Sequence, residues 1–416
     1  MSEQPQFTPS HVDPGPHWQL RFWSVFLGQA LSLIGSALTQ FVLLWWITDT
    51  TGSVTALSLM GLFALLPQAL LGPIGGAFAD RYSRRALMIA SDLISAACMV
   101  ALIALFITER IELWHVYTMT FIRSAMQAFQ SPAAMASTAM LVPRSFLPRA
   151  AGLNQTLQGL MLVGAAPLGA LAISVMPIGH ALAIDVATAV FGIVPLLFFQ
   201  IPQTRTPKED RHGFWRELAI GVATVSRNPG LWRLYALITV VVMAIMPSFT
   251  LVPLLVKEHF GGGPSEVALM EGMAGAGMLA GGVLAAVIGA TRKIHWILWG
   301  FALSSFLLGM VGFAPGDMLW LAVAFWSLSS VIYVLGNAPM ATLIQTTVPN
   351  HLQGRVFALL GTVIALAAPM GLAVAPLGEL IGIRWLFVLM GFVSGAVALL
   401  GFRSKPLMSI EQPVLR

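Results

Sequence analysis

The sequence predicts an all-α polytopic membrane protein with twelve transmembrane helices in two six-helix halves. Three observations predict this fold class: an apolar composition, a regular succession of long apolar segments, and an internal duplication. Of the 416 residues, 57% are hydrophobic and 9% are charged, whereas soluble domains average about 25% charged residues. Because a globular core cannot hide this much apolar surface, we expect the chain to be solvated by lipid.

The apolar segments follow one another through most of the chain. A helix that crosses a bilayer needs about 20 mostly apolar residues. Twelve segments meet this requirement: 21–47, 54–79, 86–108, 113–141, 150–175, 178–200, 231–256, 265–290, 294–314, 318–347, 355–379 and 382–402. They predict an N-terminal half at 21–200 and a C-terminal half at 231–402.

Polar segments separate and flank the two halves. The charged stretch TRTPKEDRHGFWRELA lies in 201–230, where we expect a cytoplasmic linker with a short surface helix. Residues 1–20 are polar and lack the basic start and apolar centre of a signal peptide. We therefore expect tails at 1–20 and 403–416.

The basic residues predict the orientation of the chain. If the N-terminus is cytoplasmic, 18 of the 22 lysines and arginines lie on the inner side. Arg110, Lys257 and Arg384 lie outside, and Arg123 lies within a segment. This asymmetry places both termini in the cytoplasm by the positive-inside rule. It also explains the basic pI near 9.8 without nucleic-acid binding.

The duplication appears as short motifs that recur at a nearly constant offset. Val142-Pro143 recurs as Val348-Pro349 after 206 residues, and Gly75-Gly76 recurs as Gly281-Gly282 after 206. Pro167 matches Pro369 after 202 residues. Two halves in the same orientation are typical of one large class of secondary transporters.

Several other functions find no support in the residues. The single cysteine, Cys98, leaves no cysteine-based metal site and no intrachain disulfide. The chain lacks the H-E-x-x-H and G-x-S-x-G motifs of metalloproteases and serine hydrolases. We therefore expect no enzymatic activity, no cofactor and no metal.

The stretch GAFADRYSRRALM at 76–88 resembles the loop signature between the second and third helices of the major facilitator superfamily. The matching residues are Gly76, Asp80, Arg81, Arg84 and Arg85, whereas Ser83 stands where glycine is usual. The stretches FIRSAMQAFQSPAAMA and LVPRSFLPRAAGLNQTLQG sharpen the likeness. Together they resemble the drug–proton antiporter subfamily of macrolide efflux proteins.

This resemblance implies a role for the charged loop. In the family, the acid at the position of Asp80 contacts the N-terminal end of the eleventh helix across the two halves. A helix N-terminus carries about half a positive charge, so the contact favours the outward-open state and breaks when the halves rock. The alternative for the loop is an orientation signal with surface ion pairs, which are individually weak.

The resemblance also implies a central cavity lined by the first, fourth, seventh and tenth helices. Polar residues recur at helical spacing on each of these segments. The residues that we expect to line the cavity are Gln29, Ser36, Gln40, Gln127, Tyr235, Met243, Met246, Tyr333 and Asn337. Amides, methionines and aromatic rings suit a bulky, amphipathic, weakly basic molecule. The serines have packing between helices as an equal alternative.

Proton antiport requires a carboxylate that titrates within the membrane. Asp185 lies roughly 10 Å deep in its segment at 1.5 Å per residue, and Glu271 lies at a similar depth. For Asp92, near the inner end of its segment, we favour a structural role beside the loop arginines. Arg123 resembles the fourth-helix arginine that drug antiporters link to proton transfer; the alternative is that Arg123 snorkels to the outer face.

These expectations combine into one leading function and two alternatives. The leading function is export of lipophilic drugs or natural products, macrolide-like in character, by proton antiport from the bacterial inner membrane. The first alternative is a dedicated exporter of an endogenous siderophore or secondary metabolite, and the second is a non-transporting receptor or scaffold with this fold. We expect a monomer whose partners are the substrate, the proton and membrane lipid, with no nucleic acid.

Overall fold

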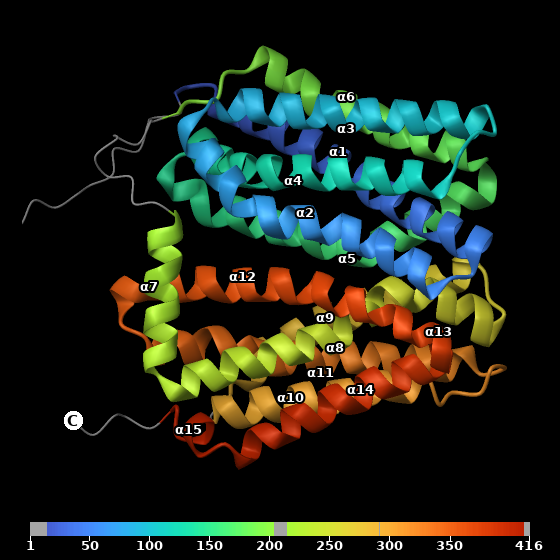
Figure 1. The fold of residues 1–416 in the computed structure, drawn as a ribbon. Coiled ribbons are helices and arrows are strands. Elements are labelled where there is room, and N and C mark those ends of the chain that lie inside the picture. Colours follow the sequence, from blue (N-terminus) through green and yellow to red (C-terminus); the bar gives the residue numbers. More distant parts are fainter. Residues whose placement is uncertain (1–14, 204–213, 291, 412–416) are drawn as a thin grey trace, which may run out of the picture.

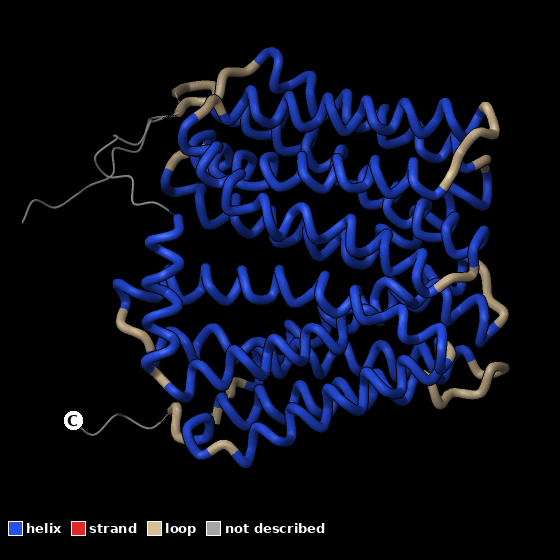
Figure 2. Tube along the Cα trace, in the orientation of Figure 1, coloured by secondary structure: helices blue, strands red, loops and turns tan. Residues whose placement is uncertain are grey.

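The computed structural model describes residues 15–203, 214–290 and 292–411, and every regular element in these ranges is a helix (Figure 2). The predicted tails at 1–20 and 403–416 and the predicted linker at 201–230 fall in part outside the described residues. Within the linker, the described residues form α7 (Phe214–Arg227), which packs against α12 of the second half (Figure 1).

The first half consists of six long helices. They are α1 (Trp18–Thr51), α2 (Val54–Arg81), α3 (Arg84–Ile107), α4 (Leu113–Leu141), α5 (Leu147–Val175) and α6 (Ile178–Phe198). Local chemistry defines their ends. Gly52 adopts a φ of 57° after α1, and the Ser53 hydroxyl then accepts a hydrogen bond from the Ala56 amide as the N-cap of α2.

The second half repeats this arrangement. Its long helices are α8 (Pro229–Phe260), α9 (Pro264–Ile288), α10 (Lys293–Val311), α11 (Leu319–Thr347), α12 (Asn350–Val374) and α14 (Ile383–Leu400). The short helices α13 (Gly378–Ile381) and α15 (Lys405–Met408) flank α14. Asn228 caps the start of α8 by accepting hydrogen bonds from the backbone amides of Gly230 and Leu231.

All twelve predicted segments coincide with helices, and the chain is a multi-pass membrane protein. Among the described residues, eleven helices are long and apolar enough to span a bilayer. The long helix outside this set is α4, whose 29 residues include Arg123, Gln127 and Gln130. These polar residues lower its hydropathy, so the count of twelve spans stays a prediction. The cytoplasmic placement of both termini is also still a prediction.

The two halves form two groups of roughly parallel and antiparallel helices, α1–α6 and α8–α14, which lie one above the other in Figure 1. They meet mainly through α2 against α12 and α5 against α9. The α5–α9 contact is close because of Gly275, where an added Cβ would lie 2.7 Å from the Leu162 carbonyl oxygen. The backbone of α9 at Gly275 therefore packs directly against the backbone of α5 at Leu162.

Polar contacts join the halves at one end of the molecule, where α1 leads into α2; we call this the closed end. The Lys257 ammonium lies 2.8 Å from the Asp49 carboxylate and also donates to the Asp49 carbonyl oxygen at 2.8 Å. The Glu379 carboxylate accepts hydrogen bonds from the Ser53 hydroxyl at 2.7 Å and the Thr55 amide at 2.9 Å. The second half thus places a cation on the C-terminus of α1 and an anion on the N-terminus of α2, matching both helix dipoles.

Candidate functional site

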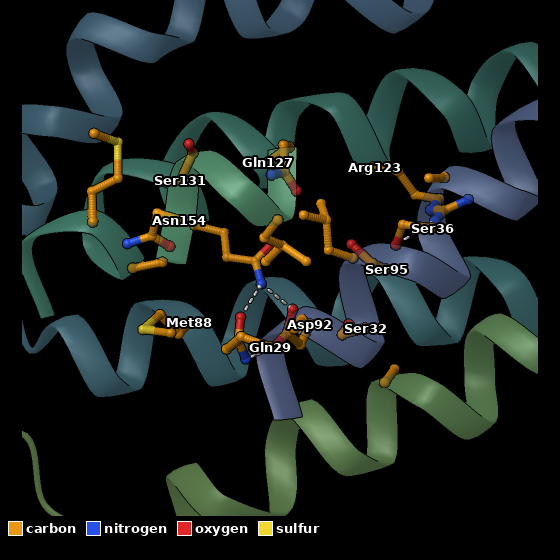
Figure 3. A pocket seen from close by; sticks show the side chains of 18 of the residues that line it. Gln29, Ser32, Ser36, Met88, Asp92, Ser95, Arg123, Gln127, Ser131 and Asn154 are labelled. Atoms are coloured by element: carbon orange, nitrogen blue, oxygen red, sulfur yellow. Dashed lines mark hydrogen bonds between the residues drawn. The ribbon is translucent and has the colours of Figure 1, made fainter. Parts of the chain in front are cut away.

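A cavity of about 380 Å³ lies among the helices of the first half, with lining residues from α1 to α6. Four of the residues that the sequence predicted for a cavity line it: Gln29, Ser36, Gln40 and Gln127. Figure 3 shows Asp92 beside Gln29, with Arg123 and Ser36 together toward one end of the view and Asn154 toward the other. The polar groups occur in two clusters along this cavity.

The first cluster is built on an ion pair and comprises Arg123, Asp185 and Ser36. The Arg123 guanidinium lies 2.6 Å from the Asp185 carboxylate, with side-chain exposures of 14% and 5%. The Ser36 hydroxyl donates to Asp185 at 3.1 Å and accepts from Arg123 at 3.2 Å. Three helices therefore converge on one buried pair. The Arg123 side chain lies in the interior, whereas the snorkelling alternative would place it at the outer face.

The second cluster, Asp92, Gln29 and Gln130, contains a carboxylate held by amides. Gln29 Nε2 donates to Asp92 Oδ2 at 3.1 Å, and Gln130 Nε2 donates to Asp92 Oδ1. Gln130 Nε2 also donates to Gln29 Oε1 at 3.1 Å, and Gln29 donates to the Gly192 carbonyl at 3.2 Å. Asp92 is only 4% exposed. In the described part of the chain, its carboxylate forms no ion pair.

The two clusters are related by a common spacing along three helices. In each helix, the residue of the first cluster and the residue that serves the second are seven positions apart. The pairs are Ser36 and Gln29 on α1, Arg123 and Gln130 on α4, and Asp185 and Gly192 on α6. Seven residues make about two helical turns, roughly 10.5 Å, and return to the same face. The cavity therefore carries two polar levels about 10 Å apart.

The charge of the lining follows from these residues. Arg123, Asp92 and Asp185 are the charged residues that line the cavity, so its formal charge is one negative. Arg123 forms an ion pair with Asp185. The Asp92 carboxylate therefore has no counterion in the lining. We expected Asp92 to accompany the loop arginines, and that expectation is wrong. The side chains of Arg84 and Arg85 turn to helix ends instead, and Asp92 lies about two turns further along α3.

The loop arginines bind backbone carbonyl groups. Arg84 is 8% exposed and donates to the carbonyls of Ala79 and Ala136, both at 3.2 Å. Arg85 donates to the Leu197 carbonyl at 2.7 Å, in the last turn of α6. Cations at helix C-termini complement the helix dipole. These two arginines hold the ends of α2, α4 and α6 together.

The remaining loop residues are more open. The Asp80 carboxylate is 65% exposed and lies 3.8 Å from Arg84, within its own half. A Cβ added at Gly76 would meet nothing within 4 Å, whereas one at Gly75 would clash with the Ala128 carbonyl. Arg81 is exposed at the end of α2. Ser83, which replaces the usual glycine, caps α3 by accepting from the Ala86 amide.

Comparison with known proteins places the chain in a family. The sequence model described as Major Facilitator Superfamily matches residues 25–372. The chain belongs to the Major Facilitator Superfamily. Macrolide efflux protein A of Streptococcus pyogenes is 32% identical over 387 residues, which cover 92% of this chain and 95% of that protein. The multidrug efflux pump Tap of Mycolicibacterium fortuitum is 23% identical over 85% of this chain and 88% of its own.

Solved structures share the fold of this Major Facilitator Superfamily transporter at low identity. A POT family transporter in complex with 5-aminolevulinic acid has a TM-score of 0.73 at 13% identity, covering 93% of this chain and 96% of its own. A bacterial homologue of the lysosomal transporter Spinster, in an inward-facing and unoccupied conformation, has a TM-score of 0.67 at 14% identity, covering 95% and 97%.

The second half of the transporter contributes none of the residues that line this cavity. Tyr235 is buried and donates to the Val356 carbonyl at 2.8 Å, which ties α8 to α12. Tyr333 is half-buried against the Phe301 ring, with centroids 5.7 Å apart. Asn337 is exposed on α11. The roles predicted for these side chains remain predictions.

Two methionines and one acid of the second half complete the predicted set. Met243 and Met246 are half-buried on α8 and lie outside the lining of the cavity. Glu271 is half-buried on α9, beside Gly272, whose added Cβ would lie 3.5 Å from Pro167 of α5. Glu271 is therefore next in sequence to a glycine that faces the other half. Within the described ranges, it forms no ion pair.

Three further polar residues of the cavity were not singled out from the sequence: Gln68, Asn154 and Gln158. Gln130 belongs to the polar face that helical spacing predicts for the segment 113–141, and it lines the cavity as well. Asn154 and Gln158 are four apart on α5, which places both on one helical face.

Proposed function

We propose that this transporter exports lipophilic drugs or natural products, macrolide-like in character, by proton antiport with alternating access in the bacterial inner membrane. We propose that it works as a monomer. The observation that carries the proposal is the cavity in the first half, which combines neutral polar groups and apolar walls with a buried Arg123–Asp185 pair. The likeness to macrolide efflux proteins supports the substrate class.

The lining of the cavity favours an amphipathic substrate. Amides from α1, α4 and α5 supply neutral donors and acceptors, while Phe26, Leu33 and Met135 supply apolar surface. Methionine adapts to ligands of varied shape, and aromatic faces accept cations and flat rings. A single arginine that is already paired suits a phosphorylated substrate poorly, because such a substrate calls for several cations.

Proton coupling needs an acid whose charge state changes the protein. Protonation of Asp185 would remove the negative partner of Arg123 and leave the guanidinium held by Ser36 and by Met99, whose sulfur lies 3.1 Å away. A buried cation without its partner is unfavourable in a membrane protein. The cavity would then rearrange around Arg123. Glu271 is the second candidate, because it is on α9, a helix that packs against α5 of the other half, next to Gly272.

Alternating access requires contacts that form in one state and break in another. The contacts of Lys257 and Glu379 across the halves support a state closed at that end. We propose that Asp80 serves the opposite end by contacting the start of α12 when that end closes. Its 65% exposed carboxylate is available for such a contact.

The test of this proposal is accumulation of lipophilic antibiotics and dyes in an efflux-deficient bacterial host. Cells with and without the protein are compared, each with and without a protonophore. Lower accumulation that the protonophore restores is the expected result. If no compound changes while the protein is present in the membrane, drug export is wrong, and a dedicated exporter of an endogenous siderophore or metabolite becomes the better proposal.

The same assay distinguishes the two candidate acids. Asp185→Asn and Glu271→Gln are compared with Asp317→Asn, which alters an exposed acid in the loop before α11. We expect one of the first two variants to lose the dependence of efflux on external pH, and the loop variant to keep it. If both retain the wild-type dependence, the coupling acid lies elsewhere.

A further inference from the structure

Asp92 is a buried carboxylate whose charge has no counterion. Both of its oxygens accept hydrogen bonds from glutamine amides, Oδ2 from Gln29 and Oδ1 from Gln130. Amides orient a carboxylate, but they carry no formal charge. A carboxylate offers about four lone-pair sites, so two or so remain available on Asp92. A charge within a membrane protein is costly and is by default a functional group.

The surrounding charges do not neutralise Asp92. The basic residue that lines the cavity is Arg123. It lies two helical turns from Gln130 along α4, and it pairs with Asp185. Arg84, eight positions before Asp92 on α3, binds the carbonyls of Ala79 and Ala136. The lining therefore keeps one net negative charge, and that charge is on Asp92. A positively charged ligand is the complement that the cavity lacks.

The wall next to Asp92 indicates the rest of this ligand. Phe26 and Phe22 lie three and seven residues before Gln29 on α1, and both line the cavity. Their rings are stacked, with centroids 5.5 Å apart. Met88 lies one turn before Asp92 on α3 and lines the cavity too. Phe22 and Met88 are each 1% exposed and support this wall from behind, whereas Phe26 is half-buried and offers its ring to an apolar body or a cation.

We propose that Asp92 binds the positively charged nitrogen of a lipophilic ammonium compound, with Gln29 and Gln130 holding the carboxylate in place. The site gives the transporter selectivity for cationic over neutral substrates. As a statement about exported substrates, the inference rests on the proposed function, but binding at Asp92 can be measured without transport. The Arg123–Asp185 pair stays intact in this arrangement, because the two clusters are about 10.5 Å apart along the helices.

A purely structural role for Asp92 makes a different prediction. If the carboxylate only links α1, α3 and α4, an asparagine at position 92 keeps an oxygen that accepts from one glutamine. Such a variant would fold and bind cations as the wild type does. If Asp92 recognises a cation, the same substitution removes the attraction while leaving the shape of the cavity. The charge of the ligand is therefore the variable that separates the two roles.

The experiment measures binding of propranolol, a lipophilic amine that carries an ammonium group at neutral pH, to the purified full-length protein by equilibrium dialysis at one fixed, neutral pH. Asp92→Asn is expected to weaken binding about tenfold to a hundredfold, the range for a hydrogen-bonded charged group. Asp92→Glu is expected to restore part of the affinity. The matched control is Asp317→Asn, which removes the same charge from an exposed loop and is expected to bind as the wild type does.

Export assays of the same variants separate this inference from the proposed function. Asp92→Asn cells should lose export of the cation while still exporting a neutral compound such as chloramphenicol. Unchanged binding of the cation by Asp92→Asn overturns the inference, as does an equal loss for cationic and neutral compounds in a variant with wild-type thermal stability. If the wild type exports neither compound yet Asp92→Asn weakens binding, the proposed function fails and the binding site stands.

Discussion

The Arg123–Asp185 pair allows a prediction that separates stability from coupling. Replacing Asp185 alone with asparagine leaves the Arg123 guanidinium, 14% exposed, without its carboxylate at 2.6 Å. Breaking a buried pair by removing one partner costs about 3–5 kcal/mol. The Ser36 oxygen at 3.2 Å remains as an acceptor, but it cannot neutralise the charge. We therefore expect the unfolding equilibrium to shift by roughly two to three and a half orders of magnitude.

Removing both charges is expected to have a much smaller effect. In the double variant Arg123→Met with Asp185→Leu, no unpaired charge is left, and replacement of a buried pair by apolar residues is often close to neutral. We expect its free energy of unfolding to lie within about 1 kcal/mol of the wild type. Proton-driven efflux is expected to be lost in the double variant, because neither charge remains to respond to a proton.

The assay is unfolding by sodium dodecyl sulfate in mixed micelles, followed by the fluorescence of the 12 tryptophans. The exposed-loop variant Asp317→Asn serves as the control and should unfold as the wild type does. If the double variant is as unstable as Asp185→Asn, the two side chains do not act as a pair. If the double variant is stable and still couples efflux to protons, the coupling role of Arg123 and Asp185 is refuted.

Three further predictions concern the contacts between the halves. Asp80→Asn should reduce efflux with normal expression, because it removes the charge proposed to contact α12, and wild-type efflux would contradict the gate. Lys257→Gln should shift the balance toward opening of the closed end by no more than about fivefold, since a partly exposed ion pair contributes about 0–1 kcal/mol; spin-label distances across that end measure the shift. Gly275→Leu should slow efflux severely, because its Cβ would lie 2.7 Å from the Leu162 carbonyl oxygen. Gly282→Leu is the control and should leave efflux unchanged, because a Cβ there would meet nothing within 4 Å.

The helices could be predicted closely because their causes are local. Long apolar runs specify where a helix crosses lipid, and caps such as Ser53 and Asn228 mark where helices begin. The predicted segment 113–141 has the same bounds as α4. The largest difference is at 355–379, where the helix α12 begins at Asn350 and a 3-10 turn follows Val374. Polar residues at the first turn of α12 concealed its start.

The site could be predicted only in part, because side-chain partners depend on how helices are arranged. Asp92 is near the loop arginines in sequence, yet its partners come from α1 and α4, 63 and 38 residues away. Helical spacing identified the polar face of α1 and α4, including Gln29 and Gln127. Tyr235 recurs at the same helical spacing and was predicted to line the cavity. Spacing alone could not show that its hydroxyl donates to a backbone carbonyl of its own half.

The duplication allows residues that line the cavity in the first half to be compared with their counterparts in the second. Helices α4 and α11 both have 29 residues, and their bounds differ by 206 positions throughout. By that offset Arg123 corresponds to Ser329, whose hydroxyl donates to the Ser304 carbonyl at 2.8 Å in a buried contact. Gln130 corresponds to Gly336, which packs so closely on Gly300 that an added Cβ would lie within 3 Å of its backbone. The same helical frame therefore supports opposite chemistry in the two repeats. In α4, long polar side chains hold the helices apart around a charged cavity. In α11, a hydroxyl and a glycine let this helix pack tightly on α10, so the polar groups of the first cavity have no counterpart at these two positions.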